Sequence, residues 1–160
     1  MRTALLVLLL STACASAQDK VAFFGLTMLD TSLQTTELGV DPAEKLRLER
    51  LETTVRDRFE TEGYTLVDLE PERTAIERVV NLAKCYGCDT RIATRLGADF
   101  SLVGEVQKVS NLILTVNLQL RDASSGDLVR GGVVDIRGNT DDSWARGMRY
   151  ILNNRIFREE

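Results

Sequence analysis

The sequence predicts an α/β fold in which helices pack on one mixed sheet of parallel and antiparallel strands. Two observations support this fold class. In the first half of the 160 residues, short apolar runs alternate with segments of helical periodicity, as in β-α-β units. In the second half, apolar residues recur at every second position, which is typical of antiparallel strands joined by tight turns. The expected order of elements is β-α-β-α-α-β-β-β-α.

The N-terminus has the pattern of a cleavable signal peptide over residues 1–17. Arg2 precedes an apolar run over residues 4–10, and residues 15–17 have the small-x-small pattern that precedes a cleavage site. The run is shorter than the about 20 residues that a transmembrane helix needs. We therefore expect a secreted, periplasmic protein with a single mature domain over residues 18–160 and no transmembrane segment in the mature chain.

The elements of the first half follow from local patterns. The apolar run over residues 21–26 predicts a buried strand, and the polar, Thr-rich stretch over residues 30–41 predicts a long loop. Pro42 is placed to begin a helix that ends at Gly63. The apolar face of this helix consists of Leu48, Leu51, Val55 and Phe59.

Three further elements are expected before residue 100, where the apolar pattern changes from helical spacing to alternation. Residues 64–69 predict a second strand, and residues 72–84 predict a second helix. Asp89 is a candidate cap for a short third helix that stops at Gly97. The side chains expected to be buried by the second helix are Ile76, Val79, Val80 and Ala83.

The C-terminal half predicts a three-stranded antiparallel meander and a final helix. Strands are expected over residues 100–109, 112–120 and 128–136, with a turn over residues 122–127. The middle strand alternates without a break, so one of its faces should be buried. The final helix, over about residues 141–157, places Trp144, Met148, Ile151 and Leu152 on one face.

Composition restricts the class of protein. The net charge of −4 does not favour a general nucleic-acid binder, and the 44% hydrophobic fraction argues against disorder. The chain has no histidine, which excludes Ser-His-Asp and Cys-His catalytic arrangements and histidine-based metal sites. We therefore predict no catalytic residues, no cofactor and no metal. Lipid attachment at Cys14 is an alternative to cleavage after the signal peptide.

The pair Cys85 and Cys88 forms a C-x-x-C motif with two interpretations. A structural disulfide between two helices suits an oxidising compartment. A thioredoxin-like redox pair is the alternative, but such a pair normally follows a strand and opens a helix, whereas this pair follows a predicted helix. Asp89 adds a negative charge beside the second cysteine.

The densest polar cluster lies where the last strand meets the final helix. One interpretation is a surface that binds a partner or ligand. The other is a capped helix whose Trp faces the core and whose Arg and Asp residues pair with one another. The candidate partner-binding residues are Asp135, Arg137, Asn139, Asp141, Asp142, Trp144, Arg146 and Arg149.

Several stretches resemble known envelope proteins. The segments LGADFSLVGEVQKVS (96–110) and LRDASSGDLV (120–129) are similar to the mixed α/β domain shared by the TolB amino-terminal domain, the curli secretion protein CsgG and the penicillin-binding-protein activator LpoB. Residues 20–157 resemble an uncharacterised bacterial family of predicted secreted proteins. This resemblance implies the fold and a cell-envelope location, and it implies no reaction.

These observations lead to three hypotheses for function. The first is a non-enzymatic periplasmic accessory domain that binds a protein partner of the envelope through the polar cluster or through an exposed sheet edge. The second is a thiol–disulfide protein that uses Cys85 and Cys88. The third is a solute or sensor accessory in which the loop over residues 30–41 closes over a pocket, with a link to quinoprotein alcohol oxidation implied by the resemblance.

Overall fold

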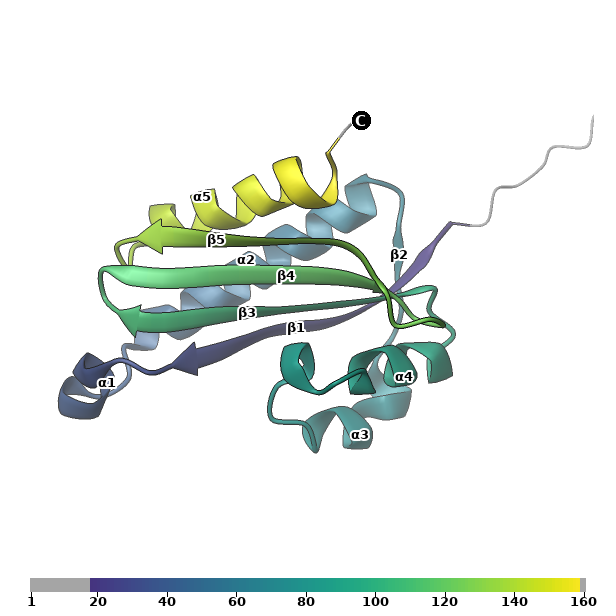
Figure 1. Cartoon of the computed structure of the whole chain (residues 1–160), viewed down its shortest axis with the longest axis horizontal. Helices are drawn as coiled ribbons and strands as arrows, with labels where there is room; N and C mark the ends of the chain where they lie inside the picture. The colour runs from purple at the N-terminus through teal and green to yellow at the C-terminus, as the bar shows by residue number, and fades with distance from the viewer. Residues whose placement is uncertain (1–17, 159–160) are drawn as a thin grey trace, which may run out of the picture.

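One five-stranded sheet organises the chain in the computed structural model, which describes residues 18–158 (Figure 1). The predicted signal peptide and Cys14 lie outside the described residues. The strands are β1 (Lys20–Asp30), β2 (Thr65–Leu66), β3 (Phe100–Ser110), β4 (Ile113–Asp122) and β5 (Leu128–Arg137). The α-helices are α1 (Leu33–Leu38), α2 (Pro42–Thr61), α3 (Arg73–Glu77), α4 (Cys88–Arg95) and α5 (Asp141–Ile151).

The strand order in the sheet is β2-β1-β3-β4-β5. Strand β1 pairs in parallel with both β2 and β3, whereas β3, β4 and β5 form an antiparallel meander. The predicted α/β fold with a mixed sheet is therefore confirmed. Because β2 has only two residues, the predicted strand over 64–69 is much shorter than expected, and β2 pairs with only Lys20 and Val21 of β1. The other edge of the sheet is the ten-residue β5.

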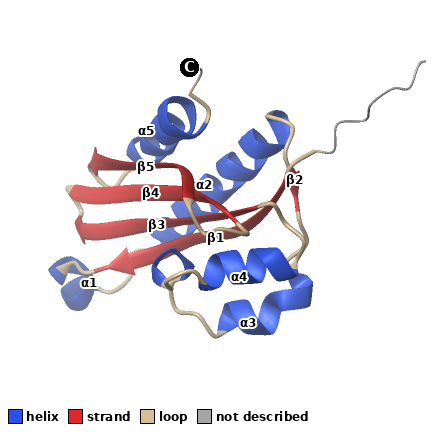
Figure 2. Ribbon diagram, turned by 45° about the vertical axis from the view of Figure 1, so that its right-hand side comes forward, coloured by secondary structure: helices blue, strands red, loops and turns tan. Residues whose placement is uncertain are grey.

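Helices cover both faces of this sheet (Figure 2). Helices α2 and α5 pack on one face, and α3 and α4 lie over the other face near β1 and β3. The predicted alternation is confirmed for Leu114, Val116, Leu118 and Leu120 of β4, which are all buried, but not for Leu112, which precedes β4 and is exposed. The four buried residues belong to the main core, which also includes the predicted helix residues Leu51, Val55, Phe59, Trp144, Met148, Ile151 and Leu152.

The segment predicted as a long loop contains a helix, so that prediction is wrong for residues 33–38. Asp30 accepts a hydrogen bond from the backbone N–H of Ser32 at 2.8 Å, and the Ser32 hydroxyl in turn accepts one from the N–H of Thr35. This arrangement satisfies donors at the start of a helix. Gly39, with a φ of 83°, ends the helix after Leu38.

The predicted helix over residues 72–84 is also wrong, because the segment is broken into a 3₁₀ turn, the five-residue α3 and a second 3₁₀ turn over Leu82–Lys84. Asn81 is extended, and its side chain accepts from the N–H of Ala83 at 2.9 Å, which begins the second turn. Side-chain hydrogen bonding of this kind competes with a continuous helix. Val80, expected in the core, is 96% exposed.

Candidate functional site

A buried lysine lies at the end of the sheet next to α1. The Lys108 side chain is 3% exposed, and its Nζ donates to Glu44 Oε1 at 2.6 Å and to Thr35 Oγ1 at 3.0 Å. It also lies 3.3 Å from Asp30 Oδ2. A buried charge is tolerated only when it is paired and hydrogen-bonded. These contacts therefore connect β1, α1, α2 and β3 through one buried ionic group.

The surroundings of Asp30 and Lys108 favour the charged form of both side chains. Burial raises the pKa of Asp30, but hydrogen bonds from Thr35, Ser32 and Lys108 outweigh burial and lower it to about 2. Burial acts to lower the pKa of Lys108, but the carboxylates of Glu44 and Asp30 raise it overall. A lowered carboxyl pKa stabilises the fold above the unfolded value of 3.8, and this contribution is lost as pH falls toward 2.

Asn139 connects this ionic group to α5. Its Nδ2 donates to Glu44 Oε1 at 2.6 Å, and its Oδ1 accepts from Trp144 Nε1 at 2.9 Å. The Trp144 side chain is 1% exposed and belongs to the main core. The buried Trp144 and the half-buried Asn139 therefore brace the junction between β5 and α5.

Asp141 joins the two helices that share one face of the sheet. Its carboxylate accepts from Arg47 Nε at 2.8 Å and also pairs with Arg50, both on α2. Hydrogen bonds from Arg47 and Arg50 lower the pKa of Asp141. Asp141, one of the predicted residues, thus links α5 to α2.

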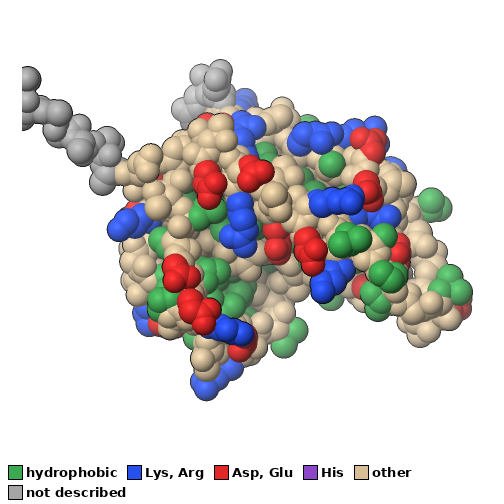
Figure 3. Space-filling model, turned by 180° about the vertical axis from the view of Figure 1, so that it is seen from behind, with side chains coloured by type: hydrophobic (Ala, Val, Ile, Leu, Met, Phe, Trp, Pro, Cys, Tyr) green, Lys and Arg blue, Asp and Glu red, His purple; other side chains and the backbone are tan. Residues whose placement is uncertain are grey.

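On the face of the molecule shown in Figure 3, basic and acidic side chains are interspersed rather than segregated.

The other five predicted residues are exposed on β5 and α5. Asp135 accepts from Thr115 Oγ1 at 2.8 Å, and Arg146 lies 3.4 Å from Asp142 across one helical turn. Within residues 18–158, neither Arg137 nor Arg149 lies within 4.0 Å of a carboxylate. We call Asp135, Arg137, Asp142, Arg146 and Arg149 the β5–α5 surface.

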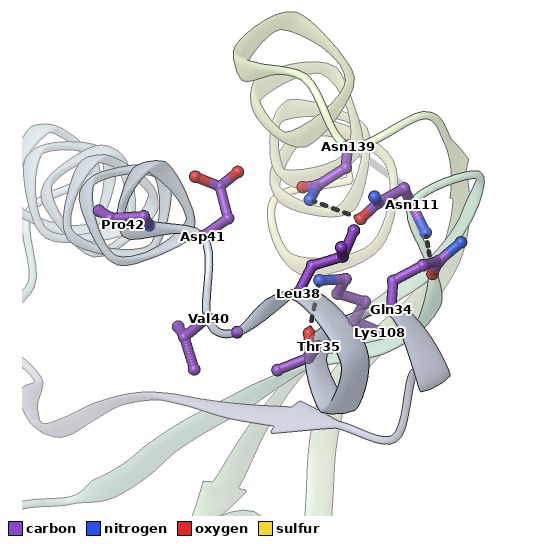
Figure 4. A pocket seen from close by; sticks show the side chains of 10 residues that line it. Gln34, Thr35, Leu38, Val40, Asp41, Pro42, Lys108, Asn111 and Asn139 are labelled. Atoms are coloured by element: carbon purple, nitrogen blue, oxygen red, sulfur yellow. Dashed lines mark hydrogen bonds between the residues drawn. The ribbon is translucent and has the colours of Figure 1, made fainter.

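A cavity of about 480 Å³ opens beside the buried lysine (Figure 4). Its apolar walls are Leu38, Val40 and Pro42, and its polar lining includes the amides of Asn111 and Asn139. The segment predicted to close over a pocket, residues 30–41, therefore does border one. The full lining is Gln34, Thr35, Leu38, Gly39, Val40, Asp41, Pro42, Lys108, Asn111 and Asn139.

The buried group was not predicted, although the sequence contains a signal for it. Lys108 lies two residues after the buried Val106 in β3, and the same alternation places Leu102 inward. A lysine that continues an inward-facing series requires a buried partner. The partners, Asp30 and Glu44, come from distant segments that the pattern of β3 does not identify.

Cys85 and Cys88 form a disulfide at the start of α4. Cys85 follows the 3₁₀ turn over residues 82–84, so the bond does not link two α-helices as expected. Asp89 is not the cap of α4, because the helix begins one residue earlier, at Cys88. The Asp89 carboxylate is instead buried and accepts a hydrogen bond from Ser101 Oγ at 2.8 Å. The alternative function of this pair, thiol–disulfide exchange with other proteins, stays a prediction.

No group of three acidic, cysteine or histidine side chains within residues 18–158 is placed to hold a metal ion. No helix in the same range is long and apolar enough to cross a bilayer.

Solved structures share this fold at low sequence identity. The LpoB C-terminal domain from Salmonella enterica matches with a TM-score of 0.54 and 14% identity, over 78% of this chain and 86% of that chain. Lipoprotein GNA1162 from Neisseria meningitidis matches with a TM-score of 0.54 and 11% identity, over 84% and 96%. The predicted likeness to LpoB is therefore confirmed for the fold. No curated protein sequence matches the chain.

A family model covers nearly the whole described domain. The family DUF3280, described as "Protein of unknown function (DUF2380)", matches residues 19–156. These residues run from the start of β1 to the end of the π-helical turn Leu152–Ile156 that follows α5. The chain therefore belongs to this family of unknown function, and its fold is that of the LpoB C-terminal domain.

Proposed function

We propose that this chain is a non-enzymatic accessory domain of the bacterial periplasm that binds a protein partner through the β5–α5 surface. The absence of histidine from the sequence and the likeness to LpoB and to a lipoprotein support this proposal. The signal-peptide pattern of residues 1–17 supports the compartment.

One observation carries the proposal. The predicted cluster divides into residues that contact other elements of the fold (Asn139, Asp141 and Trp144) and exposed residues around the junction of β5 and α5. Arg137 on β5 and Arg149 on α5 are exposed without a carboxylate within 4.0 Å in the described part of the chain. Arginines held on regular elements and free to pair are frequent energetic centres of protein interfaces.

The variant R137S/R149S is expected to lose its partner while it keeps its fold. Truncation of an interface arginine commonly costs more than about 1 kcal/mol, so binding should weaken by at least about tenfold for the pair. The partner is first captured from periplasmic extract and purified. Its dissociation constant for each variant is then measured by isothermal titration calorimetry.

The matched control is R78S/R91S, since both of these arginines are exposed but lie near α3 and α4, over the other face of the sheet. This control should bind the purified partner as the parent does. Equal affinity for the parent and R137S/R149S would remove the β5–α5 surface as the binding site.

The cavity favours a second candidate function, a solute sensor. A volume of about 480 Å³ lies within the range of small-molecule sites, and amides beside apolar walls suit a small amphipathic solute such as a short-chain alcohol. If so, titration with 1-butanol should shift the side-chain amide NMR signals of Asn111 and Asn139. The variant L38W, which fills the cavity, should abolish the shifts, and L46W on the exposed side of α2 should not. Shifts that survive L38W would exclude this cavity.

A further inference from the structure

The outer edge of β5 is open over ten residues. No strand of the described chain pairs with it on that side, and the sequence LVRGGVVDIR contains no proline. The register of β5 against β4 shifts between Leu128 and Arg130, so the regular part of this edge runs over residues 130–137. Unpaired backbone groups along a regular edge accept another strand unless proline, bulges or charge protect them. Val133, near the middle of the edge strand, is 61% exposed.

Two hollows, each of about 430 Å³, lie along this edge. The first lies between β5 and α5 and is floored by Val134, Ile136 and Tyr150. The second lies over the face of β4 and β5: it includes Leu128, Gly131 and Val133 of β5 and Asn117, Gln119 and Arg121 of β4. Successive side chains of an added strand point to opposite faces of the sheet, so hollows beside both halves of the edge suit an extended chain.

The charged side chains of the two hollows are mainly basic. The first hollow contains Arg137 and Arg146 with one acid, Asp135, whose carboxylate accepts from Thr115. The second contains Arg155 and, on β4, Arg121, whose guanidinium donates to Gln119, and it contains no acid. Within residues 18–158, Arg121, Arg137 and Arg155 have no carboxylate within 4.0 Å. This excess of positive charge stands against the net charge of −4 of the whole chain.

We infer that an extended acidic segment of the partner adds to β5 as a sixth strand. This inference rests on the proposed function and names the chemistry of the partner. Backbone hydrogen bonds along the edge supply affinity, the apolar floors accept alternate side chains, and the arginines pair with carboxylates of the added strand. A second copy of the chain fits poorly, because its own β5 would bring the same arginines to the same edge.

The probe is a pool of peptides in which Glu alternates with varied apolar residues. Each peptide has about eight residues, a typical strand length. NMR amide shifts of the ¹⁵N-labelled domain, residues 18–160, should be confined to β5 and the residues that line its two hollows. A matched pool with Lys in place of Glu should give no such shifts. Equal shifts with both pools, shifts elsewhere, or no shifts with the Glu pool would overturn the inference.

Two opposite substitutions at Val133 test the role of charge. V133D places a carboxylate in the edge and should weaken binding of the acidic pool by at least about tenfold, since like charges at an interface are strongly unfavourable. V133K changes the same exposed position and should preserve or strengthen binding. Equal effects of the two variants would contradict the inference.

Two further outcomes separate this inference from its alternatives. Concentration-dependent dimerisation in analytical ultracentrifugation that V133D abolishes would assign the edge to a second copy and overturn the inference. If R137S/R149S loses the purified partner but the acidic pool does not bind, the proposed function stands and strand addition is wrong. If the partner binds R137S/R149S normally and the pool does not bind, both are wrong.

Discussion

Replacement of Lys108 by methionine is expected to lower the free energy of unfolding by about 3 to 5 kcal/mol, the usual effect of removing one partner of a buried ion pair. The substitution leaves the carboxylates of Glu44 and Asp30 at the same buried site without their shared cation. Methionine keeps most of the length of the side chain, so lost charge rather than lost volume causes the effect. Urea denaturation at neutral pH measures it.

Two controls assign this loss to the buried carboxylates. The variant K45M removes an exposed lysine of α2 that makes a surface ion pair with Glu49, and it should change stability by less than about 0.5 kcal/mol. The triple variant K108M/E44Q/D30N removes all three charges and should recover a large part of the stability. A triple variant no more stable than K108M would show that charge is not the cause.

Replacement of Trp144 by alanine is expected to cost about 3 to 5 kcal/mol, as large-to-small changes at fully buried positions do. The indole is 1% exposed, packs in the main core, and donates to Asn139. The loss therefore combines a cavity with the loss of one of the two hydrogen bonds that Asn139 Oδ1 accepts, since the bond from Arg47 remains. Thermal and urea unfolding of W144A report the effect.

Comparison with R149A separates this structural role from a binding role. Arg149 is exposed on the same helix, and its removal should change stability by less than about 0.5 kcal/mol. A loss of partner binding in W144A would follow from damage to the fold, so that variant does not test the interface. Wild-type stability of W144A would contradict the burial of the indole.

The regular elements were predicted well where burial is one-sided over many residues. Helix α2 has an apolar face, a proline at its start and a glycine just beyond its end, and β4 alternates without interruption. Both patterns depend only on the period of the element and on the face that meets the core. The mixed α/β fold followed from the order of these patterns.

Predictions failed where side-chain hydrogen bonds decide the backbone. Helix α1 depends on contacts between Asp30, Ser32 and Thr35. The polar, Thr-rich composition of this segment predicted a loop instead. The break after α3 depends on Asn81 and on the buried Glu105 of β3, which accepts from both Asn81 and Lys84. Such contacts join segments whose local periodicity is weak, so periodicity does not detect them.

The sequence by itself determined the fold class, the paired cysteines, the family resemblance and the polar cluster at the β5–α5 junction. Only the tertiary structure decided which members of that cluster face inward, because Asn139 meets its partner Glu44 across 95 residues of chain. It also revealed the buried Lys108 and the open, basic edge of β5. Local patterns report which face of an element is buried, whereas partners from distant segments determine whether a polar side chain braces the fold or remains free to bind.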